Sequence, residues 1–130
     1  MAKKLSLLVD TDIFIEHFNH QLFRDLFEAE ELVLYYSVVT KKELLSKEGL
    51  TRPEKEAIQK FLKRYRIVPF DKSILQKYTD LRKEHSSSEK EDSLIAATAI
   101  VKKFPLVTRN YKHFKIFKEL KLYFSGSAPH

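Results

Sequence analysis

Residues 5–16 read LSLLVDTDIFIE, and this stretch decides the fold. Residues 5–9 form a short apolar run that ends abruptly at Asp10, which is typical of a strand buried on both faces. Thr11 or Asp12 is placed to cap a helix that follows directly. A buried strand that leads at once into a helix predicts a parallel sheet covered by helices.

The alternation of strands and helices continues along the rest of the chain. Further strands are predicted at residues 31–37, 66–70 and 105–108, with an edge strand at 121–124. Helices are predicted at residues 22–27, 38–47, from Pro53 onward, 71–85, 91–103 and 111–119. This order predicts one α/β domain over residues 1–124, a three-layer α/β/α fold whose central sheet has four or five mostly parallel strands. Residues 125–130 have the small, polar character of a disordered tail or a cloning remnant.

The composition excludes several classes of protein. A chain of 130 residues supports one compact core. It has no cysteine, which excludes disulfides and Cys-ligated metals and indicates a cytoplasmic location. Its two glycines are too few for a dinucleotide fingerprint, a phosphate-binding P-loop or a nucleophile elbow. No apolar run reaches the ~18 residues of a membrane span, so no membrane partner is expected.

Acidic and polar side chains follow the predicted strands, where ligands bind in parallel sheets. Asp10 ends the first strand, Glu43 lies on the helix after the second, Asp92 begins the most apolar helix, and Asn110 and His113 follow the last strand. Three carboxylates brought together repel one another unless a cation lies between them. Oxygen ligands without cysteine favour Mg²⁺ or Mn²⁺. With a net charge of +6, the inferred substrate is a phosphodiester.

Four segments carry a more specific resemblance: LLVDTDIFIE, SVVTKKELL, EDSLIAATAI and PLVTRNYKHF. In this order and spacing they resemble the PIN-domain family, and in particular the VapC-type toxins of toxin–antitoxin pairs, over residues 5–122. The resemblance implies a PIN-like fold and a Mg²⁺- or Mn²⁺-dependent endoribonuclease that acts on RNA. It also implies a homodimer and neutralisation by a small cognate antitoxin protein.

The resemblance places the family's first three acids on Asp10, Glu43 and Asp92, as catalytic and metal-binding residues. The fourth catalytic position falls on His113, where many relatives carry aspartate. Imidazole is a softer ligand with less negative charge, so a second Mg²⁺ would be held less well, which favours one-metal chemistry or Mn²⁺. Alternatively, His113 contacts substrate phosphate or exchanges a proton with the leaving oxygen.

Four further residues are expected to support the site or contact the substrate: Asp12, Thr108, Asn110 and Lys112. Asp12 is assigned first to helix capping and second to a metal contact through water. Lys112, Lys115 and Lys118 recur every third residue, and such a stripe faces either substrate phosphate or solvent.

Dimerisation is expected from the resemblance, through apolar helix surfaces that carry Phe18, Phe23 and Phe27, or Phe61 and Tyr65. An isologous pair is the usual arrangement for such a contact.

Two other functions stay open. One is a non-catalytic RNA- or protein-binding module of the same fold, which His113 in place of an acid makes plausible. The other is a phosphatase of the haloacid-dehalogenase type, whose opening motif LLVDTDIF resembles. The phosphatase is the weaker alternative, because Asp12 lacks the Gly-Thr that usually follows and because Asp92 precedes an apolar helix. It would also need Asp12 as much as Asp10.

Overall fold

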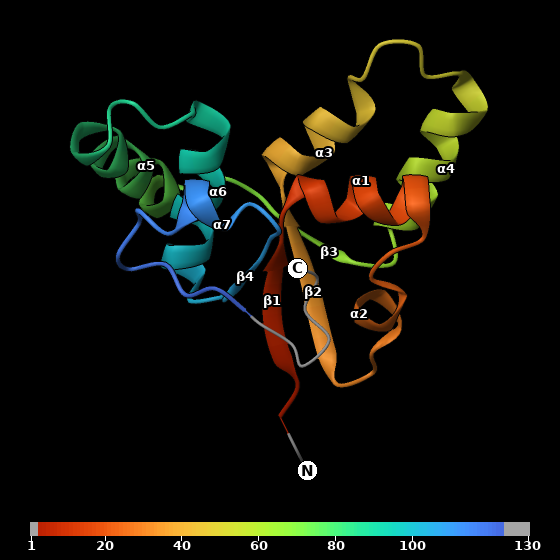
Figure 1. The fold of residues 1–130 in the computed structure, drawn as a ribbon, viewed down its shortest axis with the longest axis horizontal. Helices are drawn as coiled ribbons and strands as arrows, with labels where there is room; N and C mark the ends of the chain where they lie inside the picture. The colour runs from red at the N-terminus through yellow and green to blue at the C-terminus, as the bar shows by residue number, and fades with distance from the viewer. Residues whose placement is uncertain (1–2, 124–130) are drawn as a thin grey trace.

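A computed structural model of the chain describes residues 3–123 (Figure 1). Its elements, in chain order, are β1 (Leu5–Val9), α1 (Thr11–His20), α2 (Arg24–Glu28), β2 (Leu32–Ser37), α3 (Val38–Leu45), α4 (Arg52–Leu62), β3 (Arg66–Val68), α5 (Lys72–Glu84), α6 (Lys90–Lys102), β4 (Leu106–Val107) and α7 (Tyr111–Phe114). The tail predicted at residues 125–130 lies outside the described residues.

The central sheet has four strands in the order β3-β2-β1-β4, and every pair is parallel. β1 lies in the middle, where it pairs with β2 on one side and with β4 on the other. Leu7, Leu8 and Val9 of β1 have no solvent exposure, as the apolar run predicts for a strand covered on both faces. The carboxyl ends of the strands therefore meet at one edge of the sheet.

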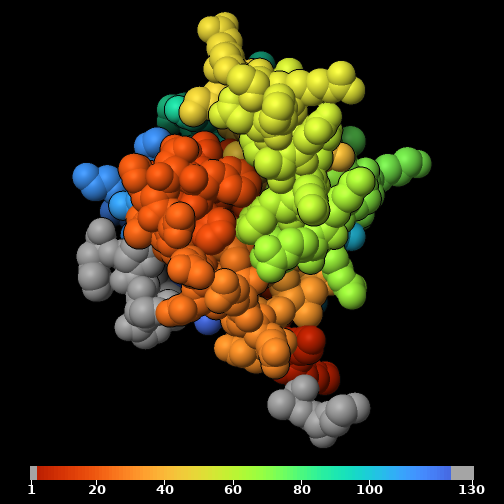
Figure 2. Space-filling view, turned by 90° about the vertical axis from the view of Figure 1, so that its right-hand side faces the viewer, coloured from red at the N-terminus to blue at the C-terminus, as the bar shows by residue number. Residues whose placement is uncertain are grey.

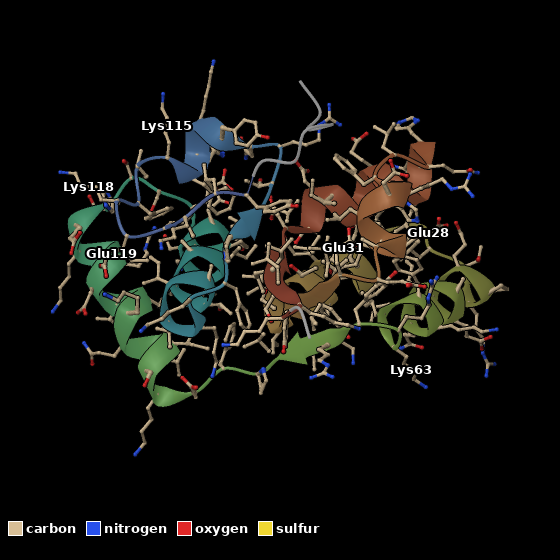
Figure 3. The ribbon with its side chains drawn as sticks, turned by 90° about the horizontal axis from the view of Figure 1, so that it is seen from below. Glu28, Glu31, Lys63, Lys115, Lys118 and Glu119 are labelled. Carbon is tan, nitrogen blue, oxygen red and sulfur yellow. The ribbon has the colours of Figure 1, made fainter. Side chains whose placement is uncertain are left out.

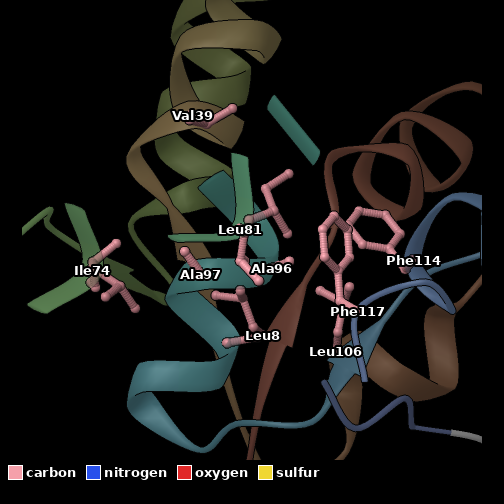
Figure 4. Packing of buried hydrophobic residues seen from close by; sticks show 12 residues of the cluster. Leu8, Val39, Ile74, Leu81, Ala96, Ala97, Leu106, Phe114 and Phe117 are labelled. Carbon is pink, nitrogen blue, oxygen red and sulfur yellow. The ribbon is translucent and has the colours of Figure 1, made fainter. Parts of the chain in front are cut away.

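Helices cover both faces of this sheet, because successive side chains of a strand point to opposite sides. Leu8 packs with α5, α6 and α7 in one core cluster, which Figure 4 shows from close by. Leu7 packs with α1, α2 and α4 in a second cluster, and α3 contributes Val39 to the first and Leu44 to the second. The predicted three-layer α/β/α arrangement is confirmed.

Local sequence signals set where the helices begin. Thr51 accepts a hydrogen bond from the Glu54 backbone N–H, Glu54 bonds back to the Thr51 N–H, and Pro53 lies in the first turn of α4. Asp71 accepts from the Ile74 N–H at 2.9 Å and starts α5, as predicted.

The second cluster contains a group of aromatic rings contributed by α1, α2 and α4. Phe27 is 5% exposed and lies 5.3 Å from the ring of Phe61 and 5.5 Å from that of Tyr65, while Phe18 lies 5.2 Å from Phe61. Figure 2 shows α1 and α4 side by side on this face. Phe27 is therefore not available as a dimer surface, and the other aromatic rings bury part of their surface against one another.

Two predicted elements near the carboxyl end are shorter than expected. The helix predicted at 111–119 ends at Phe114, after which the Phe117 and Leu120 N–H groups bond three residues back in tight turns. The edge strand predicted at 121–124 is a single parallel bridge between Leu106 and Leu122, and residue 124 lies outside the described residues.

Candidate active site

Asp10 stands where β1 ends and α1 begins, and it caps α1 itself. Its Oδ1 accepts from the Thr11 backbone N–H and its Oδ2 accepts from the Thr108 hydroxyl, both at 2.8 Å. The prediction that Thr11 or Asp12 caps this helix was wrong, because the backbone of Asp10 is still extended and its carboxylate meets the first helical N–H. Asp10 is only 6% exposed.

Burial raises the pKa of Asp10 from 3.8 to about 7. The hydrogen bond from Thr108 opposes this shift, and the negative charges of Asp12 and Asp92 add to it. Asp10 is thus a carboxyl that gives up its proton near neutral pH in the absence of a nearby cation. Asp12, in the first turn of α1, belongs to the same electrostatic environment.

Glu43 approaches from α3, which starts directly after β2. The Thr11 hydroxyl donates to Glu43 Oε1 at 2.8 Å, and Thr11 Oγ1 also lies 2.9 Å from Thr40 Oγ1. Partial burial of the carboxyl group raises the pKa of Glu43, with further upward contributions from three carboxylates of the α6 start, Glu91, Asp92 and Glu89. The bond from Thr11 acts in the opposite direction.

Asp92 lies in the first turn of α6, with its side chain 15% exposed. Its pKa is raised by burial and by the charge of Glu89, and His113 opposes both effects. Asp92 Oδ2 lies 3.3 Å from His113 Nδ1. The first turn of a helix is favourable for a carboxylate, because the helix dipole is positive there.

The loop before α6 is held by hydrogen bonds that the sequence did not indicate. The guanidinium of Arg82 donates to the Ser88 carbonyl, and the Ser88 hydroxyl bonds the hydroxyl of fully buried Ser93 at 2.8 Å. The Ser88 hydroxyl also donates to the His85 carbonyl at 2.7 Å. These bonds connect the end of α5 to the turn of α6 that carries Asp92.

His113 and Asn110 come from the segment after β4. The Asn110 backbone N–H donates to Thr108 Oγ1 at 3.0 Å, and Asn110 Nδ2 lies 2.8 Å from His113 Nδ1. As a neutral ring nitrogen, His113 Nδ1 accepts from Asn110, whereas as an N–H it donates to Asp92. Asn110 therefore favours an Nδ1 that carries no hydrogen, whereas Asp92 favours an Nδ1 that carries one.

The lysine stripe is on the surface. Lys112, Lys115 and Lys118 are all exposed, and Figure 3 shows the side chains of Lys115 and Lys118 pointing away from the molecule. This arrangement is typical of a solvated surface. The predicted contact between Lys112 and the substrate therefore stays a prediction.

The predicted acids share one environment at the carboxyl ends of β1 and β2. The negative charge of Asp92 raises the pKa of both Asp10 and Glu43. Their oxygen donors and mutual repulsion fit a hard divalent cation. Within residues 3–123, however, no three acidic or histidine side chains are arranged to ligate one ion as they stand. The residues fit the ion by chemistry and charge, and a preformed cage is absent from this part of the chain.

Comparison with known protein families shows to which family this chain belongs. The model of the PIN domain matches residues 7–120, which is most of the chain. The chain belongs to the PIN domain family. This match decides against the haloacid-dehalogenase alternative and confirms the resemblance drawn from the four sequence segments.

Individual relatives of this PIN domain agree with that assignment. Ribonuclease VapC1 of Methanocaldococcus jannaschii is 32% identical over 124 residues, covering 90% of this chain and 86% of the relative. Ribonuclease VapC10 of Mycobacterium tuberculosis is 32% identical over 122 residues, covering 88% of this chain and 90% of the relative. The solved structure of VapBC2 from Rickettsia felis, bound to a DNA fragment from its promoter, matches with a TM-score of 0.80 and 26% identity, covering 92% of this chain and 98% of that chain.

Sequence reasoning missed several residues that organise the site of this PIN domain. Thr11 was considered only as a helix cap, yet it bonds to both Asp10 and Glu43. Thr40 carried no signal, because its hydroxyl partner lies far away in the chain and leaves no periodicity to read. Ser88 lies in a serine-rich loop, where nothing in the sequence distinguishes the hydroxyl that bonds Ser93. Among residues 3–123, no helix is long and apolar enough to cross a bilayer.

Proposed function

We propose that this PIN domain is an endoribonuclease that hydrolyses RNA phosphodiester bonds with the help of Mg²⁺ or Mn²⁺. The observation that carries the proposal is the buried carboxyl of Asp10, whose pKa lies near 7 beside two further acids. Such a group stays ionised at neutral pH most readily when a cation compensates it. The two relatives that are named ribonucleases support RNA as the substrate.

Asp10, Glu43 and Asp92 are the residues that would hold the ion. When bound, the ion supplies a more acidic water and a positive charge that stabilises the phosphorane-like transition state. Thr108 orients the Asp10 carboxylate by its hydrogen bond, and Asn110 orients Thr108 in turn. His113 lies 3.3 Å from Asp92 with its ring 52% exposed, so it is able to reach substrate phosphate or the leaving oxygen.

The proposal extends to the toxin of a toxin–antitoxin pair, with a small antitoxin protein as partner. The Rickettsia felis structure, in which the VapBC2 pair is bound to promoter DNA, supports this setting. Induction of this chain alone is expected to stop growth of a bacterial host. A short reading frame directly upstream of its gene is the expected source of the antitoxin, and co-expression of its product is expected to relieve the arrest. The lack of such a reading frame, or persistent arrest, would remove the antitoxin claim.

A cytoplasmic location and a homodimer are part of the same proposal. The chain's own residues support the dimer only through the half-buried Phe18, Phe23, Phe61 and Tyr65. Sedimentation velocity at micromolar concentration is expected to show a dimer, and a monomer alone would remove this part of the proposal.

The nuclease activity is tested with purified protein and structured RNAs in Mg²⁺, in Mn²⁺ and in EDTA. Asp10→Asn and Asp92→Asn are expected to lower cleavage by about 10²-fold or more, because each removes a negative ligand. Lys83→Ala, at an exposed position on α5, serves as a control with unchanged cleavage. Cleavage that survives both acid substitutions and chelation would contradict the proposal.

A non-catalytic RNA- or protein-binding module is the second candidate. It is favoured by the absence, within residues 3–123, of three side chains arranged to ligate one ion. This candidate predicts RNA binding of equal strength in EDTA and in Mn²⁺, without turnover.

A further inference from the structure

Thr11 is the residue that connects two of the three proposed metal ligands. Its backbone N–H donates to Asp10 Oδ1 at 2.8 Å, and its hydroxyl donates to Glu43 Oε1 at 2.8 Å. Thr11 is 7% exposed, so water does not easily replace either bond. One buried residue at the start of α1 therefore fixes a carboxylate from the end of β1 relative to one from α3.

The number of hydroxyl protons shows which residue is the donor in the contact between Thr11 and Thr40. A hydroxyl has one proton, and an ionised carboxylate only accepts. Because Thr11 gives its proton to Glu43, the 2.9 Å contact between Thr11 and Thr40 requires Thr40 to be the donor. Thr40 has no solvent exposure, so its hydroxyl has no water to bond instead. The chain of hydrogen bonds runs from the Thr40 hydroxyl through the Thr11 hydroxyl to the Glu43 carboxylate.

Glu43 needs such a partner because the residue is exposed on α3 and its carboxyl group is only partly buried. An exposed glutamate on a helix samples several rotamers, and ordering it has an entropic cost that a ligand would otherwise meet on binding. The bond from Thr11 keeps the carboxylate on the Asp10 side of α3 before any ligand arrives. If Thr11 and Thr40 only filled apolar space, their hydroxyl groups would have no part in holding Glu43.

We propose that Thr11 and Thr40 are positioning residues, whose hydroxyl chain holds the Glu43 carboxylate on the side of α3 that faces the start of α1 and so limits the rearrangement that Glu43 needs to join Asp10 at a divalent cation. This inference rests on the proposed function, because it concerns the same metal site. The threonines touch neither ion nor substrate, and they act through Glu43.

The test compares isosteric variants by Mn²⁺ titration calorimetry. Thr11→Val keeps the shape and the backbone N–H but removes the hydroxyl, and it is expected to weaken Mn²⁺ binding about tenfold, as loss of an outer-shell partner typically does. Thr11→Ser keeps the hydroxyl and is expected to bind within about threefold of the natural protein. Thr98→Val is the matched control, because Thr98 is fully buried and its hydroxyl bonds only the Leu94 carbonyl within α6.

A second readout separates positioning from a general structural effect. The Mn²⁺ concentration that gives half-maximal RNA cleavage is expected to rise about tenfold for Thr11→Val and to stay unchanged for Thr98→Val. Circular dichroism melting confirms that each variant is folded. If Thr11→Val does not fold, Thr40→Val provides the same test from the far end of the chain, with a smaller loss of about threefold.

The possible outcomes are distinct. Normal Mn²⁺ affinity in both Thr11→Val and Thr40→Val overturns the positioning role while leaving the nuclease intact. Equal loss in Thr11→Ser and Thr11→Val also overturns it, because the methyl group rather than the hydroxyl would then matter. Failure of the natural protein itself to bind Mn²⁺ removes the proposed metal site, and the positioning role with it.

Discussion

At the scale of single residues, Asp10 links the stability of the protein to pH. Its pKa lies near 7, above its ordinary value of 3.8, so the group stabilises the fold while protonated. That stabilisation is complete below about pH 4 and is lost as the pH rises through 7. A shift of this size corresponds to at most about 4 kcal/mol between the two extremes.

Asp10→Asn is therefore expected to be more stable than the natural protein at pH 8 in EDTA, by about 1–3 kcal/mol. The amide retains an acceptor for the Thr11 N–H and a donor for Thr108 Oγ1. The difference is expected to be much smaller at pH 4.5, where Asp10 is protonated in the folded protein, and to vanish only below about pH 4. Urea denaturation at both pH values measures it, and a difference that does not change with pH would contradict the account.

The family resemblance places His113 at a position where an acid is expected. His113→Asp is expected to raise the ratio of Mg²⁺-supported to Mn²⁺-supported cleavage, because a carboxylate is a harder and more negative ligand than imidazole. His113→Asn, which adds no charge, is the matched control. Equal ratios in the two variants would show that the charge at this position does not select the ion.

At the scale of elements, the hydrogen-bonded loop before α6 is expected to position Asp92. Arg82→Met removes the guanidinium that donates to the Ser88 carbonyl while keeping most of the aliphatic stem. It is expected to lower the free energy of unfolding by about 1–2 kcal/mol and to slow RNA cleavage. Lys83→Met, at the exposed neighbour, is expected to change stability by less than about 0.5 kcal/mol. Unchanged cleavage in Arg82→Met would mean that the loop does not position Asp92.

Most elements could be predicted from the sequence because polar residues mark their ends. Asp10 ends β1, and Asp71 starts α5 with a side-chain cap. The end of α7 could not be predicted, because Phe114, Phe117 and Leu120 recur at a spacing that a helix and consecutive tight turns share. The choice between them depends on tertiary packing, in which Phe114 and Phe117 are both buried.

At the scale of the whole molecule, two separate core clusters lie on opposite faces of the sheet. Ile13→Val in one cluster and Ile74→Val in the other each remove one methylene from a fully buried side chain. Each is expected to lower the free energy of unfolding by about 0.5–1.5 kcal/mol. The double variant is expected to equal the sum within about 0.5 kcal/mol, as urea denaturation would show. A larger coupling would mean that the sheet transmits packing changes between its faces.

The position of the candidate site followed from topology, whereas its internal contacts did not. Parallel strands place the residues after them at one edge, which is why Asp10 and Glu43 could be grouped from the sequence. Asp92 lies in the first turn of α6, which follows another helix, and the family resemblance joined it to the other two. The bond between Thr11 and Glu43 joins residues 32 positions apart, and only the folded chain shows it. The same holds for the Thr108 hydroxyl that meets Asp10.

The central claim is that these distant acids converge on one divalent ion. Paramagnetic broadening by substoichiometric Mn²⁺, followed in amide NMR spectra, tests it most directly. If the acids converge on one ion, the signals of Thr11, Glu43, Asp92 and Thr108 are lost early, and those of Leu5, Leu32 and Arg66 at the amino ends of the strands are retained. Broadening that is absent, or that affects Glu43 and Asp92 no earlier than Leu5 and Arg66, would contradict it.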